Sequence, residues 1–124
     1  MSSRTLLRRV RGLGTAKDGV HHWWVQRLTA VALVPLCIWF VASIVLLAGS
    51  DHARVTAWIA NPVVAVFLIL TLIAMFYHLK LGLQEVIEDY IHAKPVKLAC
   101  LLMNNLGNTV LALSSVFSVL KIAV

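Results

Sequence analysis

The sequence predicts an all-α membrane protein with three transmembrane helices and no soluble domain. Of its 124 residues, 60% are hydrophobic and only 13% are charged, whereas about a quarter of residues are charged in an average soluble domain. Three apolar runs, at 28–50, 55–79 and 98–120, contain no Asp, Glu, Lys or Arg. Each run reaches the roughly 20 residues that a helix needs to cross about 30 Å of hydrocarbon.

We therefore predict spans at about 25–48, 62–84 and 98–120, which together make a three-helix anchor over residues 25–124. Residues 1–24 are expected to form a flexible cytoplasmic N-terminal arm that ends in an interfacial segment, because the tryptophans at 23 and 24 favour headgroup depth. So little chain remains outside the membrane that an enzyme complete in itself is not expected. No catalytic residue is assigned.

The basic residues predict the orientation of the spans. The net charge is +6, and most of the basic residues flank the first span or connect the second to the third. They are Arg4, Arg8, Arg9, Arg11, Lys17, Lys94 and Lys97. By the positive-inside rule, the N-terminus and the loop around Lys94 face the cytoplasm, and the C-terminus faces the other side. The charge is thus explained by topology, and a nucleic-acid partner is not expected.

Prolines mark the predicted bends and boundaries of the helices. Pro35 is expected to kink the first span. The pair Asn61-Pro62 is typical of a helix start, because asparagine caps well and proline suits the first helical position. Pro95 is expected to prevent the second long helix from continuing into the third.

Among the residues of the three apolar runs, His78 is best suited to bind a metal, because a neutral imidazole is a natural axial ligand for haem iron. Gly82, Glu85 and Asp89 follow it by four, seven and eleven residues, which puts all four on one helical stripe roughly 60° wide. A glycine one turn from the ligand gives a flat macrocycle room to approach the backbone. From spacing alone, a histidine that only hydrogen-bonds a neighbouring helix is the commoner alternative.

The same helix is expected to leave the membrane at Asp89 and Tyr90. A helix from residue 62 to about 91 is about 45 Å long at 1.5 Å per residue, longer than the hydrocarbon is thick. A carboxylate and a phenol at that exit are natural hydrogen-bonding partners for a quinone. A solvated acidic face is the alternative interpretation.

Arg27 and His21 form a second candidate group at the start of the first span. A charge one turn into a span is costly unless it is paired or reaches the interface. A haem propionate is a suitable partner, because guanidinium binds carboxylate in a bidentate fork. A simple interfacial anchor is the alternative. In the third span, Asn104 and Asn108 are one turn apart and are expected to hydrogen-bond across helices.

Two segments, GVHHWWVQRLTA at 19–30 and HLKLGLQEVIEDY at 78–90, together with the three spans, resemble the hydrophobic membrane-anchor subunit of succinate dehydrogenase, respiratory complex II. The resemblance covers nearly the whole chain, and the pattern from His78 to Tyr90 is its most specific part. It implies a four-subunit succinate:ubiquinone oxidoreductase in which the partners are a cytochrome b anchor subunit, an iron-sulfur subunit and a flavoprotein subunit.

The resemblance also implies roles for the candidate residues. His78 matches one axial ligand to haem b, with the other ligand on the cytochrome b subunit. His21 and Arg27 match positions near the haem propionates. Tyr90 matches the tyrosine that hydrogen-bonds a ubiquinone carbonyl, and Asp89 matches the acid that shapes that site. Succinate is oxidised on the flavoprotein, and electrons reach quinone at the membrane surface through the iron-sulfur subunit.

Two alternatives remain open from the sequence. One is an anchor without haem, in which His78 only hydrogen-bonds. The other is a small helper subunit of a different membrane complex with no redox role. A bacterial inner membrane is expected rather than a mitochondrial one, because the sequence has no Ser/Arg-rich transit extension of the usual length.

Overall fold

The computed structural model describes the backbone of residues 3–124 and the side chains of residues 20–124. This part of the chain folds into four helices without any strand: α1 (Ser3–Leu47), α2 (His52–Ala60), α3 (Pro62–Tyr90) and α4 (Lys94–Ala123). Three stretches are long and apolar enough to cross a membrane, at Val20–Leu47, Pro62–Tyr90 and Lys94–Ala123. The prediction of an all-α protein with three spans is therefore confirmed.

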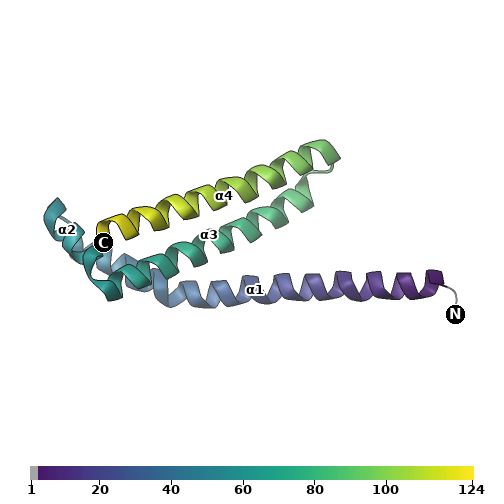
Figure 1. The fold of residues 1–124 in the computed structure, drawn as a ribbon, viewed down its shortest axis with the longest axis horizontal. Helices are drawn as coiled ribbons and strands as arrows, with labels where there is room; N and C mark the ends of the chain where they lie inside the picture. Colours follow the sequence, from purple (N-terminus) through teal and green to yellow (C-terminus); the bar gives the residue numbers. More distant parts are fainter. Residues whose placement is uncertain (1–2) are drawn as a thin grey trace.

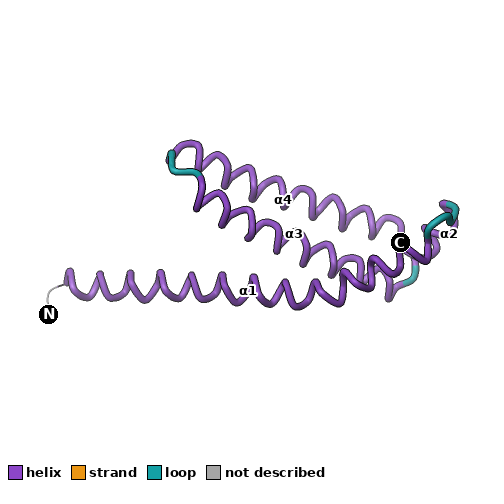
Figure 2. Tube along the Cα trace, turned by 180° about the vertical axis from the view of Figure 1, so that it is seen from behind, coloured by secondary structure: helices purple, strands orange, loops and turns teal. Residues whose placement is uncertain are grey.

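The arrangement of the chain ends agrees with the predicted topology. The N-terminus and the connection between α3 and α4 lie at one end of the molecule, while α2 and the C-terminus lie at the other (Figure 1). The short loop between α3 and α4 is seen most clearly from behind (Figure 2). The two basic segments thus lie at the same end of the helices, which is the arrangement that the positive-inside rule predicts.

Helix α1 is longer than the sequence suggested. Its 45 residues run from Ser3 without a break, so the helix includes Gly12 and Gly14 and replaces the flexible arm that was expected. The side chains of the basic residues in this arm lie outside the described residues. The helix also continues through Pro35, and its last turns lead towards α2 (Figures 1 and 2).

The helix boundaries after α1 follow from capping residues. Gly49 adopts a positive φ of 80° in the turn, a conformation that glycine reaches without a steric penalty. Asp51 then caps α2 by accepting a hydrogen bond from the Arg54 backbone amide at 2.9 Å. Asn61 caps α3 in the same way through the Val63 amide at 3.0 Å, with Pro62 in the first turn. The predicted start of this helix is confirmed.

Helix α3 ends at Tyr90, and Pro95 lies in the first turn of α4. A proline there costs nothing, because the first amides of a helix have no partner inside it. At the other end of the molecule, the Trp39 ring stacks on Trp58 with centroids 5.9 Å apart and meets Phe67 edge-on at 5.5 Å. Because Trp39 lies on α1, these aromatic contacts attach α1 to both α2 and α3.

Helix α3 is the centre of the bundle, since it packs against both α4 and α1. The buried residues all lie on α3 and α4. They are Ala65, Leu68, Thr71, Leu81, Asn104 and Asn108. Among the described residues no side chain is completely buried, and most large apolar side chains are exposed. In a membrane such surfaces contact lipid tails or other subunits.

Candidate functional site

His78 lies at the contact between α3 and α1. Its ring is half-buried, and Nδ1 is 3.1 Å from the hydroxyl oxygen of Thr29 on α1. Within the described residues, Nε2 makes no hydrogen bond. The imidazole is therefore held through one nitrogen, while the other remains available to a group outside this chain.

Thr29 belongs to a polar stripe on α1 that faces the His78 stripe on α3. His22, Gln26 and Thr29 follow one another at intervals of four and three residues, so they share one side of α1. His22 Nδ1 is 3.8 Å from Glu85 Oε1 on α3. Because the two helices are antiparallel, His22 meets Glu85 and Thr29 meets His78.

Gln26 lies between these two contacts, opposite Gly82. A Cβ atom built on Gly82 would lie 3.7 Å from Gln26 Nε2, which is an ordinary van der Waals separation. Packing against α1 therefore leaves room for alanine at this position. The face of α3 that the sequence assigned to a cofactor is thus partly covered by α1 of the same chain.

Two buried polar atoms in this stripe have no partner among the described residues: His22 Nε2 and Gln26 Oε1. A buried polar atom without a hydrogen bond is costly, so in native proteins such atoms are nearly always satisfied. Partners for these two atoms must come from groups other than the described side chains, such as water.

Arg27 and His21 lie elsewhere on α1. The Arg27 guanidinium is exposed and sits over the Trp23 ring, 4.6 Å from its centroid, an arrangement typical of a cation–π contact. His21 is also exposed, and it is His22 that faces α3. Arg27 makes no ion pair within the described residues, so its charge is free to meet a carboxylate from outside.

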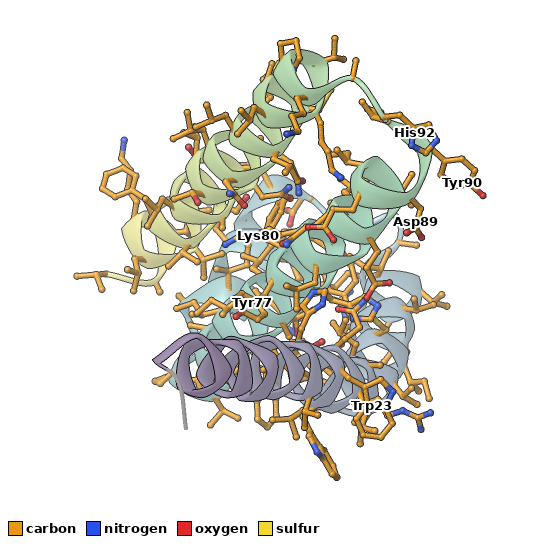
Figure 3. The ribbon with its side chains drawn as sticks, turned by 90° about the vertical axis from the view of Figure 1, so that its right-hand side faces the viewer. Trp23, Tyr77, Lys80, Asp89, Tyr90 and His92 are labelled. Atoms are coloured by element: carbon orange, nitrogen blue, oxygen red, sulfur yellow. The ribbon has the colours of Figure 1, made fainter. Side chains whose placement is uncertain are left out.

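Asp89 and Tyr90 lie at the end of α3, and both are exposed. Tyr90 is 78% exposed, and its side chain projects away from the helices, while Asp89 lies just below it (Figure 3). Asp89 is eleven residues from His78 and shares its stripe, whereas Tyr90 points about 100° further round the helix. Neither side chain is hydrogen-bonded within the described part of the chain.

Asn104 and Asn108 are not part of this site. Asn104 Nδ2 donates to the Lys80 backbone carbonyl on α3 at 2.9 Å, so the predicted hydrogen bond across helices is confirmed. Gln26 and Thr29 were not predicted from the sequence. Their spacing with His22 was the available signal, because three polar residues on one side of an apolar helix indicate a contact with a polar neighbour.

No group of three or more His, Cys, Asp or Glu side chains in the described range is placed to hold a metal ion by itself. An axial haem ligand does not need such a group, because the porphyrin supplies the other nitrogen ligands and one histidine from each chain is enough.

Comparison with known proteins decides the family. The family model of the succinate dehydrogenase/fumarate reductase transmembrane subunit matches residues 1–120. The chain belongs to this family. It is 34% identical to the succinate dehydrogenase hydrophobic membrane anchor subunit of Rickettsia bellii. The alignment spans 114 residues, which are 92% of this chain and 83% of the relative.

Two further relatives carry related names. The succinate dehydrogenase hydrophobic membrane anchor subunit of Paracoccus denitrificans is 29% identical over 82% of this chain and 78% of its own length. The succinate dehydrogenase membrane anchor subunit of Reclinomonas americana is 23% identical over 70% and 75%, respectively. This member of the transmembrane-subunit family is a membrane anchor subunit of a succinate dehydrogenase complex. The relatives from Rickettsia and Paracoccus are bacterial, which supports the predicted inner membrane.

Proposed function

We propose that His78 is one of the two axial ligands of a haem b shared with the cytochrome b anchor subunit. The observation that carries the proposal is that only one of the two ring nitrogens of His78 is hydrogen-bonded within the described residues. His78 is half-buried in a membrane span and hydrogen-bonded only through Nδ1, so Nε2 has no hydrogen bond within the described residues and can bind a group from outside the chain. Bound haem b supplies one-electron redox chemistry at this position.

Asp89 and Tyr90 form part of the ubiquinone site. The Tyr90 hydroxyl donates a hydrogen bond to a quinone carbonyl, and the Asp89 carboxylate makes the rim of the site polar. Their exposure at the end of α3 supports this role, since a shared pocket needs side chains that are still free in each separate subunit. Iron-sulfur and cytochrome b subunits provide the remaining walls.

Arg27 and His21 bind the haem propionates. Arg27 is suited to this because guanidinium pairs with carboxylate, and its only charged or aromatic contact within the described residues is the Trp23 ring. His21 lies in the interfacial segment just before it. The chain thus contributes to haem binding at two depths in the membrane: inside a span through His78, and near the interface through Arg27 and His21. Succinate oxidation takes place on the flavoprotein subunit.

This chain contributes to electron transfer by fixing the distance between His78 and Tyr90. Twelve residues separate the two, which is about 18 Å along a helix at 1.5 Å per residue. One rigid helix therefore fixes how far the haem ligand lies from the quinone-binding tyrosine. This is catalysis by positioning rather than by a reacting side chain.

The test is the visible absorption spectrum of the purified complex. We expect His78→Ala to remove the haem Soret band, whereas the matched control His52→Ala, in exposed α2 at the other end of the molecule, retains it. Copurification of the flavoprotein and iron-sulfur subunits with each variant shows that the complex has assembled. A Soret band that is absent from the wild-type complex, or unchanged by His78→Ala, would support the haem-free anchor instead.

A further inference from the structure

We infer that Thr29 is a positioning residue for the haem ligand: it holds His78 as the tautomer with a proton on Nδ1 and a lone pair on Nε2. This inference rests on the proposed haem ligation by His78. It assigns a role to a side chain on a different helix, which the pattern from His78 to Tyr90 does not include.

The tautomer follows from the hydrogens available at Thr29. The hydroxyl oxygen is 2.9 Å from the Val25 backbone carbonyl and 3.0 Å from that of Gln26. A hydroxyl has one hydrogen and two acceptor lone pairs, and the carbonyls have no hydrogen to offer. Both distances fit a hydroxyl hydrogen that points towards these carbonyls, and in that orientation a lone pair of the oxygen remains for His78.

The third neighbour of the Thr29 oxygen is His78 Nδ1, at 3.1 Å. Since the oxygen acts as acceptor here, the hydrogen of this bond must come from the imidazole. A neutral imidazole carries one N–H, so a proton on Nδ1 leaves Nε2 with its lone pair. That nitrogen has no hydrogen bond within the described residues and is the atom that can bind iron.

The backbone of α1 gives this contact its rigidity. Threonine is branched at Cβ and has few rotamers in a helix, and its hydroxyl is fixed to the carbonyls of the preceding turn. The acceptor is thus part of the α1 framework rather than a mobile side chain. Thr29 consequently fixes the orientation of the imidazole ring as well as its tautomer.

A hydrogen bond to the distal nitrogen of a ligating histidine makes the ligand more basic. A more basic ligand favours ferric over ferrous iron, so Thr29 lowers the reduction potential of the haem. Loss of the hydroxyl should raise the potential and weaken haem binding. Changes of this kind typically cost 10–100-fold in metal affinity.

The experiment compares Thr29→Val with Thr29→Ser in the assembled complex. Valine has the shape of threonine without the hydroxyl, whereas serine keeps the hydroxyl and loses the methyl group. Haem content per flavin and the haem midpoint potential are measured for each. We expect Thr29→Val to raise the potential, up to about 59 mV for a tenfold change in the ratio of ferric to ferrous affinity, or to lower haem content, while Thr29→Ser resembles the wild type.

Thr71→Val is the matched control. Thr71 is buried on α3, and its hydroxyl donates to the Phe67 carbonyl at 2.7 Å without contacting His78. This variant therefore removes a similar hydroxyl far from the imidazole and should leave both readouts unchanged.

Three results would overturn the role of Thr29: a Thr29→Val complex with wild-type haem content and potential, a Thr29→Ser complex that changes as much as Thr29→Val, or an equal change in Thr71→Val. Failure of the proposed function is seen separately. In that case His78→Ala retains the Soret band, or the wild-type complex contains no haem.

Discussion

Asn104 on α4 donates a hydrogen bond to the backbone carbonyl of Lys80 on α3, with 2.9 Å between the nitrogen and the oxygen. Asn108, one turn further along α4, donates in turn to the Asn104 side-chain oxygen at 2.6 Å. Both asparagines are buried. The bond to Lys80 crosses from α4 to α3 and fixes the register of the two helices, while the bond from Asn108 holds the Asn104 side chain in place within α4.

Asn104→Ala should weaken the contact between α3 and α4. Hydrogen bonds between membrane helices are worth about 0.6 kcal/mol on average and up to about 1.7 kcal/mol, and this change also leaves Asn108 without its acceptor side chain. We expect a loss of about 1 kcal/mol in the free energy of unfolding, measured by denaturant titration of the purified complex. The control is Asn105→Ala, which removes an exposed amide from the next position. Equal loss in both variants would contradict the role of Asn104.

Tyr90→Phe should impair quinone reduction. The change removes a single hydroxyl whose hydrogen bond is worth about 0.5–1.5 kcal/mol, which corresponds to a decrease of roughly 2- to 12-fold in kcat/KM for quinone. Succinate oxidation with an artificial acceptor should stay at the wild-type rate, because that reaction does not use this site.

Tyr77→Phe is the control for Tyr90→Phe, because Tyr77 is an exposed tyrosine on the same helix that lies near Lys80 (Figure 3). It should affect neither activity. If Tyr90→Phe lowered both activities to the same extent, a role of Tyr90 in assembly would explain the result better than quinone binding.

Gly82→Ala should not disturb the packing of α1 on α3. The new Cβ meets Gln26 Nε2 at 3.7 Å, and alanine favours a helix over glycine by up to about 1 kcal/mol. We expect the yield of assembled complex to equal that of Gly107→Ala, a control with no atom within 4 Å of its Cβ. A specific loss of assembly in Gly82→Ala would show that α1 approaches more closely in the complex than in the isolated chain.

The helical architecture was predictable because its causes are local. Uncharged runs of sufficient length specify the spans, and Asn61 and Pro62 specify a helix start through their own backbone preferences. The extension of α1 to Ser3 was missed, because Gly12 and Gly14 indicated flexibility from their intrinsic propensity alone.

The candidate site was less predictable, because it depends on which faces of two helices meet. His21 and His22 are adjacent in sequence but point about 100° apart on a helix, and only the packing of α1 on α3 brings His22 to Glu85. The contact of Thr29 with His78 joins residues 49 positions apart. No local pattern encodes a pairing of that kind, although the polar stripe on α1 indicated that some partner exists.

The absence of any fully buried side chain in the described residues affects how long an unassembled copy of the protein survives in the cell. A newly made copy that finds no partner has few buried side chains of its own, and most of its large apolar side chains are exposed. Such orphan copies are natural substrates for membrane proteases, since local opening exposes a chain to cleavage. We therefore expect the lifetime of this chain in the membrane to depend on its assembly with other subunits.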